Sequence, residues 1–182
     1  MITFEQKHIS ARTAAENLEN VIVVDGLSKS HAMAGWRLGW TVAPVNVLEK
    51  FLNFTSATIF GCCQFIQDAA AFAMQNDGDY IQSITDKYKA RRDYALERIR
   101  QIDGLRCTKP QAGIFLMVDV SDISEDGQAF ASDLLDNQGV SFLPGGGFGA
   151  ITRNFVRLSL THPKEDLQEA FDRRENFVSS CR

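Results

Sequence analysis

Hydrophobic residues fall into short runs and helical repeats that predict alternating strands and helices. Residues 21–24 read Val-Ile-Val-Val, a continuous β-branched run that is typical of a strand covered on both faces in a parallel sheet. A second strand is predicted over residues 36–42, and Pro44 is placed to open a helix. Residues 64–74 are apolar and rich in alanine, and their length predicts a buried helix.

The clearest helical period runs over residues 79–102, and Gly104 supplies a stop. After it, the pattern predicts strands over residues 114–120, 140–143 and 155–160, a helix over residues 128–137 and a final helix from Pro163. A change of composition near residues 76–78 marks a domain boundary. The sequence therefore predicts an α/β fold in two unequal pieces, residues 1–76 and 77–182.

Composition and charge exclude several functions. The chain has 182 residues, 45% of them hydrophobic and 23% charged, which is close to the globular average. The net charge is −4 without a dense basic block, so we expect no nucleic-acid partner. No apolar run approaches the roughly 20 residues that span a bilayer. The four cysteines fit no zinc spacing, so we expect no metal, buried free thiols and a reducing cytoplasm.

The most unusual segment is residues 26–40, which read Gly-Leu-Ser-Lys-Ser-His-Ala-Met-Ala-Gly-Trp-Arg-Leu-Gly-Trp. Lys29 directly follows a predicted buried strand, which is where open α/β sheets bind ligands. Partial desolvation there would lower the pKa of the amine and make it nucleophilic. Taken alone, however, a lysine at such a place is more often a solvated turn residue.

The whole string resembles the lysine signature of the class I and II aminotransferases. The match runs through Gly26, Ser28, Lys29, Arg37 and the glycines around Arg37, and it keeps the lysine-to-arginine spacing. The resemblance implies that Lys29 forms a Schiff base with pyridoxal 5'-phosphate and that Arg37 holds the cofactor phosphate. Many relatives have a hydroxyl residue in the place of Gly26 and use it to bind the cofactor phosphate. That contact is missing here, although the family pattern tolerates glycine, and compensation by Ser28 or Ser30 stays open.

A second arginine lies in residues 154–160, Asn-Phe-Val-Arg-Leu-Ser-Leu. Strand alternation would put Phe155, Arg157 and Ser159 on one face. By itself Arg157 is more typical of an exposed charge on a strand. The family, however, ends with a similar strand whose arginine binds the substrate α-carboxylate, and the resemblance transfers that role to Arg157.

A glycine-rich turn, residues 144–149 (Pro-Gly-Gly-Gly-Phe-Gly), could be mistaken for a phosphate loop. It lacks the Lys-Ser/Thr ending and precedes no predicted helix, so nucleotide binding is disfavoured. It resembles the turn between two small-domain strands of aminotransferases. Residues 110–115 similarly resemble the entry into a strand near the substrate.

The resemblance begins near Asn20 and leaves out parts of the family's site. In family members, an aspartate that pairs with the pyridine nitrogen and a tyrosine on the ring oxygen lie thirty residues or more before the lysine. We therefore expect this chain to be an inactive fragment of a homodimeric enzyme. Residues 1–76 would be the remainder of a large cofactor-binding domain with a mostly parallel, incomplete sheet, and residues 77–182 a small α+β C-terminal domain with a long linking helix.

The function implied is transamination of an α-amino acid with a 2-oxo acid. The residues around Lys29 also look similar to those of arginine:pyruvate-type transaminases. Two alternatives stay open: another pyridoxal-phosphate reaction such as β-elimination, and a non-catalytic interaction module. Cofactor absorbance and its change with added amino acid would separate these.

Overall fold

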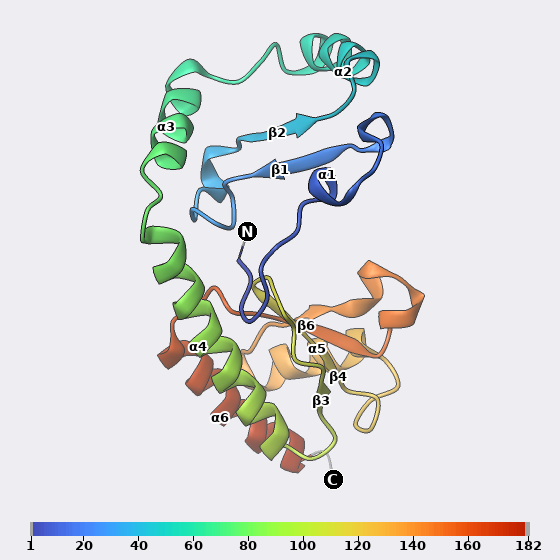
Figure 1. Cartoon of the computed structure of the whole chain (residues 1–182). Helices are drawn as coiled ribbons and strands as arrows, with labels where there is room; N and C mark the ends of the chain where they lie inside the picture. The colour runs from blue at the N-terminus through green and yellow to red at the C-terminus, as the bar shows by residue number, and fades with distance from the viewer. Residues whose placement is uncertain (1, 181–182) are drawn as a thin grey trace. The chain divides into compact units, whose positions relative to one another are not determined.

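A computed structural model describes residues 2–180, with side chains described for residues 2–173. The chain divides into two compact units, one up to Thr85 and one from Asp86 onward. Figure 1 shows the elements of both. Among the described residues, no helix has the length and apolarity to cross a membrane. The boundary expected at residues 76–78 stays a prediction.

The first unit is built on two short strands. β1 (Val23–Gly26) pairs antiparallel with β2 (Gly39–Val42), with Val23 opposite Val42 and Gly26 opposite Gly39. The expectation of a parallel sheet was wrong, because the connection over residues 27–38 holds only the 3-10 helix η2 (Ala34–Trp36). A parallel pair needs a crossover that is usually a full α-helix. Strand β2 accordingly begins at Gly39 instead of residue 36.

The other elements of this unit are helical. Short α1 (Ala11–Ala14) and η1 (Leu18–Asn20) precede β1. The helix opened by Pro44 is confirmed as α2 (Val45–Thr58), and the alanine-rich segment as α3 (Gln64–Gln75).

Much of the apolar surface of the first unit is exposed in this chain. Val24 is 75% exposed, and in α3 Phe65 and Phe72 are each 67% exposed, with Ala70 as the buried residue of that helix. The expectation of a buried strand and a buried helix was therefore wrong for this chain. Apolar periodicity reports a preference for burial, and a neighbouring element must be present to satisfy it.

The cysteines divide in the same way. Cys62 and Cys63 are free and exposed, and Cys107 is free and half-buried. Free thiols are thus confirmed at these three positions, while burial was wrong for Cys62 and Cys63. Cys181 lies outside the described residues.

The second unit has an antiparallel four-stranded sheet in the order β3-β4-β6-β5. Its strands are β3 (Arg106–Cys107), β4 (Phe115–Asp119), β5 (Leu143–Pro144) and β6 (Phe155–Ser159). The helices are α4 (Tyr80–Gln101), which begins in the first unit, α5 (Gly127–Gln138) and α6 (Lys164–Ser180). The predicted strands and helices of this half are confirmed within a few residues, but two-residue β3 was not predicted.

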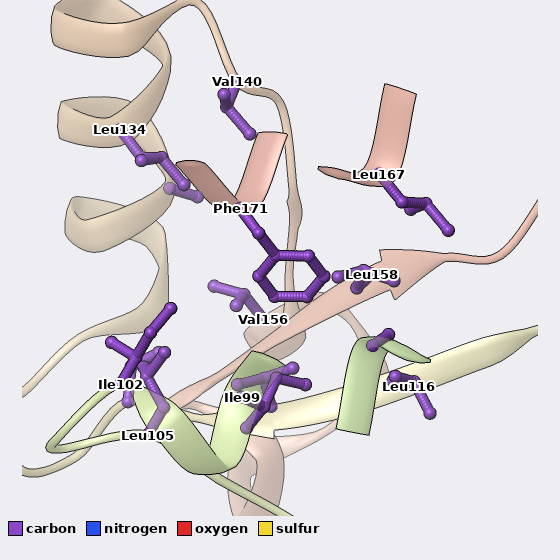
Figure 2. Close-up of a cluster of buried hydrophobic side chains, with 14 of the residues drawn as sticks. Ile99, Ile102, Leu105, Leu116, Leu134, Val140, Val156, Leu158, Leu167 and Phe171 are labelled. Carbon is purple, nitrogen blue, oxygen red and sulfur yellow. The ribbon is translucent and has the colours of Figure 1, made fainter. Parts of the chain in front are cut away.

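One face of this sheet meets the helices in a packed core. Leu116 and Val118 of β4 and Val156 and Leu158 of β6 are buried, and Phe171 of α6 lies in the same cluster, next to Leu158 and Val156 (Figure 2). The alternate residues of both strands are half-buried, so their side chains stand on the opposite face. Phe155, Arg157 and Ser159 share that second face, as the alternation predicted.

Helix α4 also buries an arginine. Arg92 is fully buried; its Nη2 lies 2.7 Å from Asp93 Oδ1, and its Nη1 donates to the Pro110 carbonyl at 3.0 Å. The guanidinium thus ties the helix to the segment that leads into β4. A charge this deeply buried must be paired, because an unpaired one would cost several kcal/mol.

Candidate cofactor and substrate site

The connection between β1 and β2 is closed at its base by two glycines. A Cβ on Gly26 would lie 2.9 Å from the Leu38 carbonyl oxygen, and one on Gly39 would lie 2.8 Å from that of Asp25. Real Cβ contacts are essentially never so short, so the two backbones can approach this closely only with glycine at both positions. Lys29 lies three residues after Gly26, and Arg37 lies two residues before Gly39. Both residues are therefore near in sequence to the glycine pair that closes the connection.

Inside the connection, the chain turns around a buried leucine. Leu27 is 3% exposed, and its carbonyl accepts hydrogen bonds from the backbone N–H of His31 and Met33 at 3.1 and 3.3 Å. Lys29 lies in the turn thus formed, with an exposed side chain. This fixes the backbone and leaves the amine accessible to a small molecule.

His31 anchors the same turn to the start of α4. Its ring stacks on Tyr80 with centroids 6.1 Å apart, and the Tyr80 hydroxyl donates to the His31 carbonyl at 3.3 Å. The Ser30 hydroxyl lies 3.0 Å from His31 Nδ1, while Nε2 is buried without a hydrogen-bond partner among the described residues. These contacts give His31 a structural role in holding the turn.

Arg37 has a left-handed backbone, with φ of 55° and ψ of 41°. Ala32 in the same connection also has a positive φ, of 54°. Such conformations cost a non-glycine residue on the order of 1–3 kcal/mol and tend to gather at functional sites. The Arg37 Nη1 donates to the Ala34 carbonyl at 2.9 Å, which orients the guanidinium while the side chain stays exposed.

In the second unit, Arg157 is held by aromatic rings. It lies on β6 opposite Met117 of β4 and Leu143 of β5. Its guanidinium carbon is 4.1 Å from the centroid of the Phe115 ring and 5.0 Å from that of Phe148. Both distances are within the range of cation–π attraction. Sequence reasoning missed the two rings, although Phe115 could have been found as a diagonal neighbour once β4 and β6 were paired.

Phe148 belongs to the glycine-rich turn between β5 and β6. This turn consists of η3 (Gly145–Phe148) and η4 (Ala150–Thr152). The Thr152 hydroxyl lies 2.7 Å from the Gly145 carbonyl oxygen and 2.9 Å from that of Gly149, so it closes the turn. The location between two strands agrees with the likeness to the family's turn.

The chemistry of the first connection fits a phosphorylated aldehyde. An accessible primary amine, an oriented guanidinium and the hydroxyls of Ser28 and Ser30 come from one short segment. An amine can bond an aldehyde carbon, and guanidinium and hydroxyl groups suit a phosphate. Pyridoxal 5'-phosphate carries both groups. In the part of the chain that the structure describes, no His, Cys, Asp and Glu cluster is arranged to hold a metal ion.

Comparison with known proteins decides the family. The profile described as "Aminotransferase class I and II" matches residues 2–173. The chain belongs to the class I and II aminotransferase family. It is 36% identical over 169 residues to the arginine–pyruvate transaminase of Pseudomonas aeruginosa, and 31% identical over 177 residues to the probable N-acetyl-LL-diaminopimelate aminotransferase of Bacillus subtilis.

Solved structures agree with this membership. An aromatic aminotransferase from Pyrococcus horikoshii is 28% identical with a TM-score of 0.93, and the match covers 98% of this chain and 48% of that one. The alignment with the Pseudomonas enzyme covers 93% of this chain and 43% of the relative, and that with the Bacillus protein 97% and 44%. The chain thus spans less than half the length of these aminotransferases.

Proposed function

We propose that this chain supplies the cofactor-binding lysine and the substrate-binding arginine of a pyridoxal-phosphate-dependent transaminase. The main observation behind the proposal is the closed β1–β2 connection. In it, Lys29 and Arg37 lie within three residues of the glycine pair that closes it. Membership of the family supports the same reading. The proposed substrates are an α-amino acid and a 2-oxo acid.

In this proposal, Lys29 holds the cofactor through its aldehyde carbon, and Arg37 holds the phosphate with help from Ser28 or Ser30. When bound, the cofactor supplies a conjugated ring that accepts the electron pair left on the substrate α-carbon. Arg157 binds the substrate α-carboxylate and so orients the α C–H bond. The freed Lys29 amine would then take the proton from the substrate α-carbon as general base and, as general acid, deliver it to the cofactor carbon.

Similarity to known transaminases indicates which substrates to test first. The residues around Lys29 look similar to those of arginine:pyruvate-type transaminases, and the relative at 36% identity is named for arginine and pyruvate. Arginine and pyruvate are therefore the first pair to test. The proposal also includes a homodimeric enzyme in the cytoplasm.

Because the chain spans under half of each relative, we further propose that turnover needs polypeptide equivalent to their remaining half. The 182-residue chain should then bind cofactor weakly and show no measurable transamination. Catalysis by the chain alone would contradict this part of the proposal.

The test is a titration of the full chain with pyridoxal 5'-phosphate. Binding is monitored by the absorbance band of the imine between lysine and cofactor, at the edge of the visible range. Lys29→Ala should abolish the imine band, while Lys50→Ala, which removes an exposed lysine of α2, should leave it unchanged. Arg37→Ala should weaken binding about ten- to a hundredfold, the effect of losing a charge-assisted hydrogen bond. Arg12→Ala is the matched control, because Arg12 is the other arginine of the first unit and is also exposed.

Equal effects of Arg37→Ala and Arg12→Ala on cofactor affinity would contradict the phosphate-binding role of Arg37. An imine band that survives in Lys29→Ala would contradict the Schiff-base role of Lys29.

A further inference from the structure

A ligand carboxylate binds arginine best when the guanidinium is already held in one orientation. A free arginine side chain must be ordered on binding, which costs conformational entropy. Arg157 is half-buried, and its guanidinium carbon is near two aromatic rings, at 4.1 Å from Phe115 and 5.0 Å from Phe148. The two rings come from different segments and have different surroundings.

Phe115 is part of the sheet. It pairs with Ser159 in the β4–β6 ladder, while Arg157 pairs with Met117, so the ring and the guanidinium are diagonal neighbours on one face. Its neighbour Leu116 is buried in the core. The position of Phe115 therefore follows from the fold itself.

Phe148, in contrast, is 53% exposed on the glycine-rich turn. The root of this turn is fixed, because a Cβ on Gly145 would lie 2.3 Å from the Thr152 carbonyl oxygen and the Thr152 hydroxyl closes the loop. Its tip is open, since a Cβ on Gly147 or Gly149 would meet nothing within 4 Å. The Phe148 ring therefore gains little stability from burial at this open tip. Its contact with the Arg157 guanidinium is the interaction that we consider functional.

We propose that Phe148 is a positioning residue for Arg157 and, through Arg157, for the substrate carboxylate. The proposal rests on the carboxylate role of Arg157 stated above. The ring limits the orientations of the guanidinium before ligand arrives, so that the N–H edge is presented to the carboxylate. This role for Phe148 comes from its contact with Arg157, and neither the lysine motif nor the strand pairing would have indicated it.

The test uses nitrogen-15 NMR of the full chain, with the side-chain Nε–H signal of Arg157 assigned by its loss in Arg157→Lys. Pyruvate is the carboxylate probe. The signal should move on titration in the wild type. Phe148→Leu keeps an apolar side chain but removes the π face, and it should raise the Kd for pyruvate about two- to tenfold.

Two further variants separate the aromatic contact from general damage to the turn. Phe148→Tyr keeps the ring and should stay within about twofold of the wild type. Ile151→Ala removes a side chain that is 91% exposed in the same turn, and it should also stay within about twofold. Without ligand, the Arg157 signal should lose part of its ring-current shift in Phe148→Leu alone.

The outcomes distinguish the two claims. A wild-type signal that ignores pyruvate defeats the carboxylate role of Arg157, and the positioning role with it. A wild type that binds pyruvate while Phe148→Leu binds equally well overturns only the positioning role. Equal weakening by leucine and tyrosine also overturns it, because the π face would then be irrelevant.

Discussion

Replacing Gly145 by alanine should damage the second unit far more than the same change at Gly147, two residues later. A Cβ on Gly145 would lie 2.3 Å from the Thr152 carbonyl oxygen, 2.6 Å from the Phe155 carbonyl oxygen and 3.0 Å from Phe155 Cβ. Two of these three atoms belong to the backbone and cannot rotate away. A Cβ on Gly147 would meet nothing within 4 Å.

The magnitude follows from these contacts. Overpacking of a tight site usually costs about 1–3 kcal/mol, and contacts with fixed backbone atoms belong at the upper end. If the turn moves away to relieve them, the hydrogen bond between Thr152 and Gly145 is lost, at about 1 kcal/mol. We expect Gly145→Ala to lower the free energy of unfolding by about 3–4 kcal/mol, and Gly147→Ala to change it by less than about 0.5 kcal/mol.

Urea unfolding followed by far-ultraviolet circular dichroism measures the difference, with hydrogen exchange of β4 and β6 amides to assign it to the second unit. Tryptophan fluorescence is unsuitable, because Trp36 and Trp40 both lie in the first unit. With an m value of about 2 kcal/mol/M, Gly145→Ala should lower the midpoint by about 1.5–2 M. Equal midpoints for the two variants would refute the reasoning.

Two further predictions concern burial. The half-buried Cys107 thiol has its pKa raised by burial from 9.0 to about 11, so alkylation at pH 8 should label exposed Cys62 much faster. Because the thiol ionises at lower pH in the unfolded chain than in the folded one, the stability that Cys107 contributes should be complete below pH 9 and lost as pH rises through about 11. A constant difference between the urea midpoints of wild type and Cys107→Ala over this pH range would contradict it. Phe171→Ala should destabilise the chain by about 3–5 kcal/mol in urea unfolding, while Phe72→Ala, at a 67% exposed position, should change it by less than about 0.5 kcal/mol.

Local patterns in the sequence identified the helices well. The period over residues 79–102 became α4, and Gly104, with a φ of +86°, follows its end as the stop signal required. The same helical period also contains a signal for a buried charge. Arg92 fills the position between Tyr88 and Ala95 on the apolar face, and an arginine at such a position is a candidate for a buried, paired charge.

Strand pairing was harder, because it depends on contacts between distant residues. The run Val21–Val24 indicated a strand, but it could not show that β1 begins at Val23 and pairs antiparallel with β2. β3 has two residues, too few for any alternation to appear. Hydrophobic composition gives the tendency of a segment to be buried, whereas its partner is set by chain connection and register.

The candidate site shows the same division. The string around Lys29 was sufficient to recognise the motif, and alternation correctly placed Arg157 on the same face of β6 as Phe155 and Ser159. The left-handed backbone of Arg37 and the contact of Phe148 with Arg157 could not be read from the sequence, because each depends on the folded geometry of a turn.

The central claim is that Lys29 carries the cofactor, and borohydride reduction tests it most directly. The full chain is mixed with pyridoxal 5'-phosphate below one equivalent, reduced, digested and mapped by mass spectrometry. Reduction makes the bond between amine and cofactor permanent, so the label marks the lysine that formed it. The account predicts label concentrated on Lys29 and lost in Lys29→Ala. Label spread evenly over the exposed lysines, or concentrated on another one, would contradict it.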